Sequence, residues 1–520
     1  MARTAGAWLV AGVVAVHAVA LPNGFVYDDH EVILAQQPVR SARELARVFA
    51  EPHGLPLSQL PYYRPLARAS LLVQKGLHGD WAAPFHLANA LVMGGIALAA
   101  RALLRAPGLG LGAAGATWAA AAFALHPIAS ETSFPIASGR ETALPVLFVL
   151  LAMAAWLRGR RALALAAGAA ALWSKEQAIV LPALVALADA LRLGADPPGP
   201  RVRAWAVRLA PWLALVVLYL LVRRAIVPPS GDPPGTLWAW IAAHPFAPLA
   251  SGLYLVQSAF APTAALLYEP RLEVWLSVPR AALALVTFAA VLAAALARGP
   301  RAAVAFWVGW MPLGMAFHLG WLPVEVQFSE RYLVLSSLAL AALVALAGGG
   351  LAARGPSWRP ALAAAGAAVL ILLAVLTVQR AGAYRDELAF TRRWVASDPA
   401  HANAQASLGA VLARHGRDDE ALAALREAVR LEPRLAAAWY NQGVLLARNG
   451  RLDEAREAFA ACLRADANDA DAHYALGVLL ARRGERADAE AHLRRALALR
   501  PGFGEARAAL AELTERPAPR

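Results

Sequence analysis

Residues 84–104 read PFHLANALVMGGIALAARALL, an apolar stretch whose first charged side chain is Arg101. A helix needs roughly 20 apolar residues to cross the hydrocarbon core of a bilayer, so this stretch predicts a membrane-spanning helix. The sequence therefore predicts an all-α fold that begins with a polytopic membrane helical bundle of about eleven transmembrane helices. Further segments that approach the same length are 5–21, 109–126, 141–157, 162–174, 177–193, 205–222, 279–297, 302–321, 331–348 and 360–379.

The composition also indicates a chain that lies mostly in lipid. Hydrophobic residues make up 59% and charged residues 16% of the 520 positions, whereas soluble domains are about one quarter charged. The net charge of +13 belongs to the membrane half, because acidic and basic side chains balance from Asp398 onward. This distribution argues against a nucleic-acid partner and favours basic loops on one side of a membrane. The single cysteine, Cys462, excludes an internal disulfide and a cysteine-based zinc site.

The basic loops predict the topology, since cytoplasmic loops carry the excess of arginine. Placing all of them in the cytoplasm requires segments 162–174 and 177–193 to form a hairpin, and residues 249–261 to lie at the interface rather than cross. Residues 5–21 are expected to remain as an uncleaved first span. An odd number of spans then puts the C-terminus outside. The basic clusters are Arg101 with Arg105; Arg158, Arg160 and Arg161; Arg192, Arg201, Arg203 and Arg208; Arg298 with Arg301; and Arg354 with Arg359.

A repeat begins after residue 397. Small residues, prolines and glycines recur there every 34 positions, a period and pattern typical of the tetratricopeptide repeat (TPR). The sequence predicts a membrane domain at 1–380, a linker at 381–397, a TPR α-solenoid of three repeats plus a capping helix at 398–514, and a disordered tail at 515–520. The recurring positions are Pro399, Pro433, Ala467 and Pro501; Gly409, Gly443 and Gly477; Gly416, Gly450 and Gly484; and Ala421, Ala455 and Ala489.

The first predicted extracytoplasmic loop carries adjacent carboxylates in the stretch FVYDDHE at 25–31. These acids could serve only to solvate the loop. Alternatively, desolvation near lipid and repulsion between Asp28 and Asp29 would raise the pKa of one acid toward the working range of a general base.

Further polar groups lie at the ends of apolar segments on the same predicted side, where they are costly unless paired or functional. Each one alone could be a snorkelling anchor. Together, carboxylates with Arg and Lys suit a reaction whose leaving group is a phosphate and whose acceptor must lose a proton. The motifs are YRPL at 63–66, HPI at 126–128 with Glu131, GRE at 139–141, SKE at 174–176 and SERY at 329–332.

In their order and spacing, these motifs, FHLAN at 85–89 and the trailing repeats resemble the transmembrane and TPR-containing O-mannosyltransferases and their bacterial relatives. Those enzymes are C-type (GT-C) polytopic glycosyltransferases, and the resemblance covers nearly the whole chain. It implies transfer of a mannose-like sugar, with inversion, from a polyprenyl-phosphate donor to an acceptor hydroxyl outside the cytoplasm. The resemblance leaves open whether a divalent cation takes part, because some C-type enzymes use one and others do not.

The resemblance also implies roles for individual residues. Asp28 matches the acid of the first loop and would be the base with Asp29 as its partner, although which of the two acts stays open. His126 and Glu131 would shape the acceptor or donor pocket. The groups expected to stabilise the departing phosphate are Arg140, Lys175 and Arg331, and the remaining predicted donor-binding residues are Arg64, Glu176 and Glu330.

Two other functions stay open at this point. The chain could be a non-enzymatic membrane-anchored TPR scaffold for an envelope complex, because TPR arrays bind peptides and a fold alone assigns no chemistry. It could also be a polysaccharide polymerase or ligase that uses a lipid-linked donor. The enzyme hypothesis expects the repeats to bind a protein or peptide acceptor. High Ala and Arg content suggests a GC-rich bacterial genome, hence an inner-membrane protein with the repeats in the periplasm.

Overall fold

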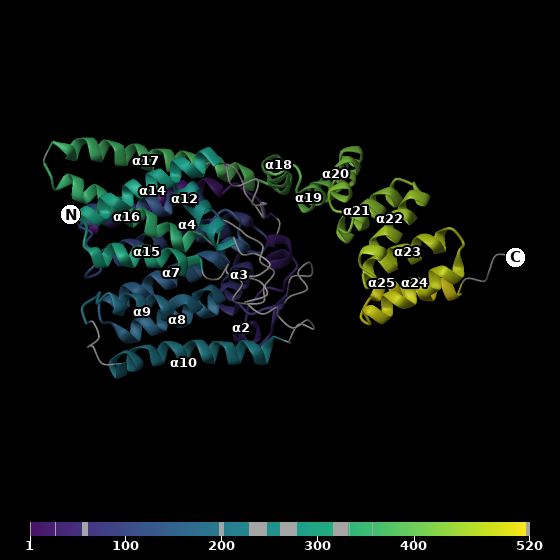
Figure 1. The fold of residues 1–520 in the computed structure, drawn as a ribbon. Coiled ribbons are helices and arrows are strands. Elements are labelled where there is room, and N and C mark those ends of the chain that lie inside the picture. Colours follow the sequence, from purple (N-terminus) through teal and green to yellow (C-terminus); the bar gives the residue numbers. More distant parts are fainter. Residues whose placement is uncertain are drawn as a thin grey trace. The chain divides into compact units, whose positions relative to one another are not determined.

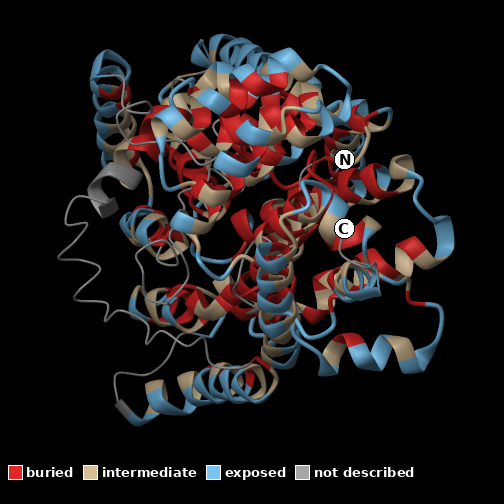
Figure 2. Ribbon diagram, turned by 90° about the vertical axis from the view of Figure 1, so that its right-hand side faces the viewer, coloured by how far each residue is buried: buried red, intermediate tan, exposed pale blue. Residues whose placement is uncertain are grey.

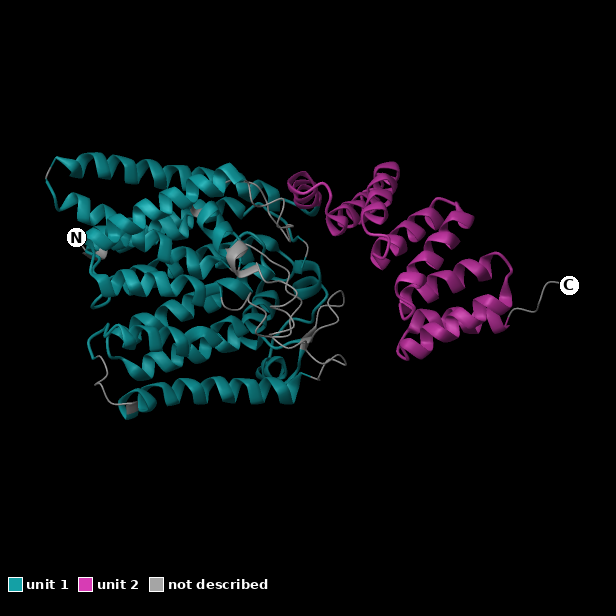
Figure 3. Cartoon of the chain, viewed as in Figure 1, with its two compact units in different colours: residues 1–387 teal, residues 388–520 magenta. Residues whose placement is uncertain are grey.

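A computed structural model describes residues 2–26, 28–54, 61–196, 202–227, 247–260, 278–315, 331, 333–355 and 357–515. This part of the chain is almost entirely helical, as predicted, and its only strands, β1 (His53–Gly54) and β2 (Pro61–Tyr62), form a short antiparallel pair. The chain divides into two compact units, residues 1–387 and 388–520 (Figure 3).

Unit 1 is a bundle of long helices that run side by side (Figure 1). Six helices among the described residues are long and apolar enough to cross a membrane: Ala82–Leu104, Ala137–Leu157, Arg203–Ile226, Val278–Arg298, Val334–Ala352 and Trp358–Tyr384. Three shorter apolar helices accompany them: Thr4–Ala20, Ala113–Ala124 and Arg161–Ser174.

The sequence predicted about eleven spans, whereas six helices among the described residues are long and apolar enough to cross a membrane. Segment 177–193 opens with a 3₁₀ turn, η3 (Glu176–Val180), which leaves only ten residues for α9 (Leu181–Ala190). The described part of segment 302–321 is α15 (Arg301–Met315). Segment 249–261, predicted at the interface, contains α12 (Ala247–Phe260), which packs against α14 (Val278–Arg298) and α16 (Val334–Ala352). Its 14 residues are too few to span alone.

The other labelled elements of unit 1 include the apolar helices just described and the short elements that join them. They are α1 (Ala2–His17), η1 (Ala18–Ala20), η2 (His30–Leu34), α2 (Ala42–Ala50), α3 (Pro65–His78), α4 (Ala82–Leu104), α5 (Ala113–Ala124), α6 (Pro127–Ser130), α7 (Ala137–Leu157), α8 (Arg161–Ser174), α10 (Val202–Ile226), α17 (Trp358–Ala381) and η6 (Gly382–Tyr384).

Helix α7 is at the centre of unit 1 and packs on α4 and α8. In α7, 78% of the most apolar stretch of the helix is buried inside the structure, whereas in α10 only 11% is buried. Helix α10 instead exposes Val207, Leu213, Val217, Leu218 and Leu221, and helices at the outline carry long pale-blue exposed stretches in Figure 2. Soluble proteins rarely expose contiguous apolar faces of this kind, so these helices have the surface expected of a lipid-facing bundle.

The loops with arginine clusters gather at one end of unit 1. The backbone N–H of Gly194 donates to the carbonyl of Pro107, and that of Ala195 donates to the carbonyl of Leu157. At the same end, Arg208 binds the buried carboxylate of Asp189 through Nε (2.7 Å) and Nη2 (2.8 Å). The loops with the candidate site residues lie at the opposite end of the helices.

Unit 2 consists of antiparallel helix pairs in the order that the repeat predicts. A methyl group at Gly443 would approach the Phe459 ring to 2.7 Å, so the recurring small residue lets the two helices of a pair meet. Gly450 has a φ of 75°, which suits glycine at a helix end. The helices are α19 (Ala402–Arg414), α20 (Asp418–Leu431), α21 (Ala436–Arg448), α22 (Leu452–Ala465), α23 (Ala470–Arg482), α24 (Arg486–Leu499) and α25 (Gly504–Glu515).

The predicted linker at 381–397 is wrong, because most of it is helical. It contains η6 and α18 (Glu387–Ser397), which buries Phe390 and Trp394. Leu388 packs against the core of unit 2, and the Trp394 ring lies 5.1 Å from that of His401. Helix α18 therefore belongs to the repeat unit. Of the predicted tail, 515 ends α25 and 516–520 lie outside the described residues.

Candidate functional site

The two adjacent acids of the first loop have different surroundings. Asp29 is 1% exposed, and its Oδ1 accepts the N–H of Ala137 at 2.7 Å. Its Oδ2 accepts the N–H groups of Val26 (3.0 Å) and Ile136 (3.4 Å). Burial raises the pKa of Asp29 to about 7, although these N–H donors act to lower it. Asp29 therefore joins the first loop to the first turn of α7, with both oxygens engaged by backbone.

Asp28 is partly exposed, and its carboxylate accepts no hydrogen bond from the described residues. Burial raises its pKa to about 6, against the lowering effect of the positive charge of Arg331. Arg64 and Lys175 also lower the pKa, and Glu141 raises it. Asp28 thus has an acceptor oxygen available among charged groups, and it titrates in the range useful to a general base.

Arg64, at the start of α3, binds two carboxylates. Its Nη2 and Nε donate to the two oxygens of Glu176, at 2.6 and 3.1 Å, and its Nη1 donates to Glu141 at 2.6 Å. The guanidinium also lies over the ring of Tyr62, 4.4 Å from its centroid. Burial favours the neutral form of Glu176, but Arg64 and Lys175 hold its pKa at about 2.

Lys175 separates α8 from η3 and is 2% exposed. Its Nζ is 3.4 Å from Oγ1 of Thr142. Burial, followed by repulsion from Arg64 and Arg331, lowers its pKa to about 7. We call Asp28, Arg64, Glu141, Lys175, Glu176 and Arg331 the charged cluster; its positive and negative groups are equal in number.

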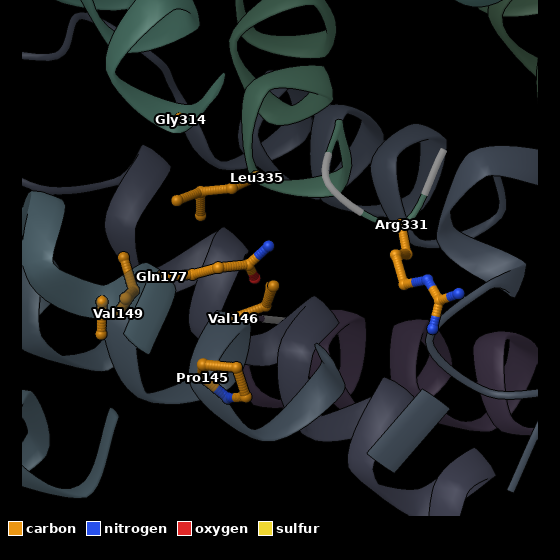
Figure 4. Close-up of a pocket in the computed structure, with 8 residues that line it drawn as sticks. Pro145, Val146, Val149, Gln177, Gly314, Arg331 and Leu335 are labelled. Carbon is orange, nitrogen blue, oxygen red and sulfur yellow. The ribbon is translucent and has the colours of Figure 1, made fainter. Parts of the chain in front are cut away.

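An apolar cleft lies beside the charged cluster. Figure 4 shows the Gln177 side chain extending between Leu335 above it and Pro145 below it, with Arg331 to one side. The cleft holds about 330 Å³ of space that includes open solvent. Its walls come from α7, η3, α15 and α16, and the lining residues are Pro145, Val146, Val149, Gln177, Ala178, Gly314, Arg331 and Leu335.

Three predicted site residues lie in other environments. Arg140 is 4% exposed and uses its guanidinium to bind Asn89 (2.5 Å) and Gln74 (3.0 Å), so it joins α7 to α3 and α4. His126 caps α6, with Nδ1 accepting the N–H of Ile128 at 3.1 Å. Glu131 forms a buried ion pair described below. Glu330 lies outside the described residues.

Some residues of this end were not among the predicted site residues. Glu141 shares Arg64 with Glu176, and it stands beside Arg140 in a motif that the sequence had already singled out. Arg380 directly follows the apolar segment 360–379, a position at which an ionisable residue is costly unless paired. Its position in the sequence could therefore have indicated that Arg380 is paired or functional.

Among the described residues, no group of three or more His, Cys, Asp or Glu side chains is arranged to hold a metal ion.

Comparison with known proteins identifies the repeats. The tetratricopeptide repeat family matches residues 385–435, 407–470 and 440–502, so the C-terminal region consists of TPR repeats. Among curated proteins, no relative matches the chain.

Solved TPR structures resemble parts of the chain. A MamA crystal structure has 23% identity and a TM-score of 0.23, covering 25% of this chain and 70% of that one. YrrB, described as a TPR protein with an unusual peptide-binding site, has 22% identity and a TM-score of 0.22, covering 39% and 91%. The first TPR of Spaghetti (RPAP3), bound to an HSP90 peptide, has 18% identity and a TM-score of 0.22, covering 23% and 94%.

Proposed function

We propose that this chain is an inverting membrane glycosyltransferase that moves a mannose-like sugar from a polyprenyl-phosphate donor to an acceptor hydroxyl, on a protein, at the extracytoplasmic face. The observation that carries the proposal is the position of Asp28, with its raised pKa of about 6, among Arg331, Arg64 and Lys175. A base next to fixed positive charges is what a reaction requires when its acceptor hydroxyl must lose a proton and its leaving group is a phosphate.

In this mechanism, the oxygen of the acceptor hydroxyl attacks the anomeric carbon of the sugar. Asp28 accepts the proton that this hydroxyl loses. The bond from that carbon to the phosphate oxygen breaks, and its electron pair stays on the phosphate. Arg331 and Lys175 stabilise the resulting charge. Arg64 is bound to Glu176 and Glu141, so its role is to fix these carboxylates. The apolar cleft beside Arg331 suits the first isoprene units of the lipid.

The two ends of the helix bundle support the proposal that the site and the repeats lie on the same side of the membrane. The side chain of Asn23 donates to the carbonyl of Ala381 at 3.1 Å, so α17 ends beside the first loop. The chain continues from there into the TPR repeats, and the arginine loops lie at the other end of the bundle. This arrangement supports an active site and a protein-binding array outside the cytoplasm, in a bacterium the periplasm.

Sugar transfer from a labelled polyprenyl-phosphate mannose by the purified full-length protein tests the proposal. Asp28→Asn should lower the rate by at least about 100-fold, the lower end of what a general base contributes. Glu31→Gln, in the same loop, is the matched control and should retain the rate. Transfer at the wild-type rate by Asp28→Asn would overturn the assignment of the base.

The TPR match favours one alternative, a non-enzymatic membrane scaffold. A scaffold would keep its cellular function in Asp28→Asn and lose it on deletion of residues 398–520. The glycosyltransferase would lose its function in Asp28→Asn while the variant remained folded and inserted.

A further inference from the structure

We propose that Glu131, Arg380 and Tyr384 are positioning residues that form a latch between the last helix of unit 1 and the loop that carries Asp28. Glu131 Oε1 accepts a hydrogen bond from Nη2 of Arg380 at 2.7 Å and another from the hydroxyl of Tyr384. The Glu131 and Arg380 side chains are 4% and 1% exposed. A carboxylate so enclosed by its own chain has no face to offer a substrate.

The latch acts on the segment between α5 and α7. Glu131 lies in this segment. Ile136, the last residue of the segment, and Ala137, the first residue of α7, donate their N–H groups to Asp29. The last residues of the segment are fixed by Asn89, whose Nδ2 donates to the carbonyls of Ser133, Pro135 and Ile136. A movement of Glu131 therefore reaches Asp29 through the few backbone residues between 131 and 137. Asp29 is bonded directly to Asp28 along the chain, so the position of Asp28 changes with it.

The first loop is attached to the same end of α17 by its own backbone. Gly24 donates its N–H to the carbonyl of Arg385 at 2.9 Å, and Asn23 donates to Ala381. The loop is thus held at its start by residues 381–385 and at Asp29 by residues 136–137. Glu131 joins these two supports, because its partners Arg380 and Tyr384 directly precede the anchoring residues Ala381 and Arg385, and its own segment ends at Ile136.

Loss of the Glu131 charge removes one partner of a buried ion pair with Arg380, and breaking a buried pair in this way disrupts local structure strongly. None of the charged cluster is altered by that change. The latch therefore predicts that the loop carrying Asp28 becomes more mobile when the Glu131 charge is lost, while the residues of the charged cluster are unchanged. The claim about sugar transfer rests on the proposed function, whereas the claim about the loop does not.

Hydrogen exchange of the full-length protein in detergent, followed by mass spectrometry, measures the loop directly. In Glu131→Gln, amides of residues 24–29 should exchange at least about tenfold faster than in the wild type, and those of unit 2 should be unchanged. Tyr384→Phe should give a smaller increase, and it decides the matter if Glu131→Gln does not fold. The double variant Glu131→Gln with Arg380→Met removes both charges and should restore part of the protection.

The matched control is Asp189→Asn, which also neutralises a buried carboxylate bound to an arginine, at the opposite end of the bundle. It should leave exchange at residues 24–29 unchanged. Wild-type exchange there in folded Glu131→Gln and Tyr384→Phe, or an equal increase in Asp189→Asn, would overturn the latch.

Transfer kinetics separate positioning from substrate binding. A positioning role predicts a lower kcat in Tyr384→Phe with KM for donor and acceptor unchanged, and a substrate ligand would raise KM instead. If the wild type transfers no sugar, the proposed function fails, and the exchange measurement still decides the latch.

Discussion

Arg64 holds Glu176 by two parallel hydrogen bonds, Nη2 to Oε1 at 2.6 Å and Nε to Oε2 at 3.1 Å. Both side chains are about nine-tenths buried, and the pair joins the start of α3 to η3. Bidentate contact of this kind fixes the direction of a carboxylate as well as its distance. It therefore makes Arg64 a structural centre of the charged cluster, which holds Glu176 and Glu141 in place.

Arg64→Met should lower the free energy of unfolding by about 3–5 kcal/mol, because it leaves two buried carboxylates without their cation. The double variant with Glu176→Gln should lose less than the sum of the single losses. Thermal unfolding in detergent measures both effects. Additive losses would mean that the two residues are not coupled.

The sugar-transfer rate should have a narrow optimum between pH 6 and 7. Asp28 must be ionised to act as base, so activity rises as pH increases through its pKa of about 6. Lys175 must be protonated to meet a phosphate, so activity falls as pH increases through its pKa of about 7. Rates at about pH 5 and pH 8 should be roughly fivefold to tenfold below the maximum.

The variant Lys175→Arg separates the two limbs of this profile. Arginine stays charged throughout the range, so the fall above pH 7 should disappear while the rise near pH 6 remains. A profile of unchanged shape would show that Lys175 does not set the alkaline limb.

A large side chain in the apolar cleft should discriminate between donors by lipid length. Leu335→Trp fills space beside Gln177 and Val146, so KM for a long polyprenyl donor should rise at least about tenfold. KM for a donor with a short, water-soluble lipid should change little. Leu351→Trp, on the same helix but away from the cleft, is the control. Equal effects on both donors would remove the cleft as the lipid site.

The repeat glycines should be sensitive to a single methyl group. Gly443→Ala places a carbon 2.7 Å from the Phe459 ring and should cost about 1–3 kcal/mol through overpacking. Gly502→Ala meets nothing within 4 Å and should be near neutral. Limited proteolysis of the full-length protein, read at peptides of unit 2, measures the difference.

The proposed topology predicts that alkaline phosphatase fused after Arg520 is active, since that enzyme works only outside the cytoplasm. The same reporter fused after Arg160, in a basic loop, should be inactive. Activity at Arg160 or silence at Arg520 would contradict the common side for the site and the repeats.

Local periodicity made the repeat unit predictable. The 34-residue spacing of Gly409, Gly443 and Gly477 identifies the helix pairs directly, because each pair folds against its own neighbours. The helical character of unit 1 was equally visible from its apolar segments. The linker prediction failed at α18 because its buried residues, Phe390 and Trp394, precede the first repeated position.

The site was less predictable because its contacts join distant parts of the chain. Asp28 and Asp29 are adjacent and chemically identical, and what distinguishes them is burial and the backbone N–H groups of residues 26, 136 and 137 that bind Asp29. Glu131 was grouped with the substrate-binding residues because its motif lies at the same end of the bundle. Its partner Arg380 is 249 positions away, and no spacing rule connects them.

The attachment of Asn23 to Ala381 has a consequence for biosynthesis. These residues are 358 positions apart, so at synthesis rates of about 5–20 residues per second the first loop waits roughly 20–70 s for its anchor. During that interval the first loop has left the ribosome, but Ala381 and Arg385, which anchor Asn23 and Gly24, have not been made. A nascent chain that stops before α17 would therefore contain every residue of the charged cluster but lack the anchor of the first loop, so α17 is the element that completes the support of that loop.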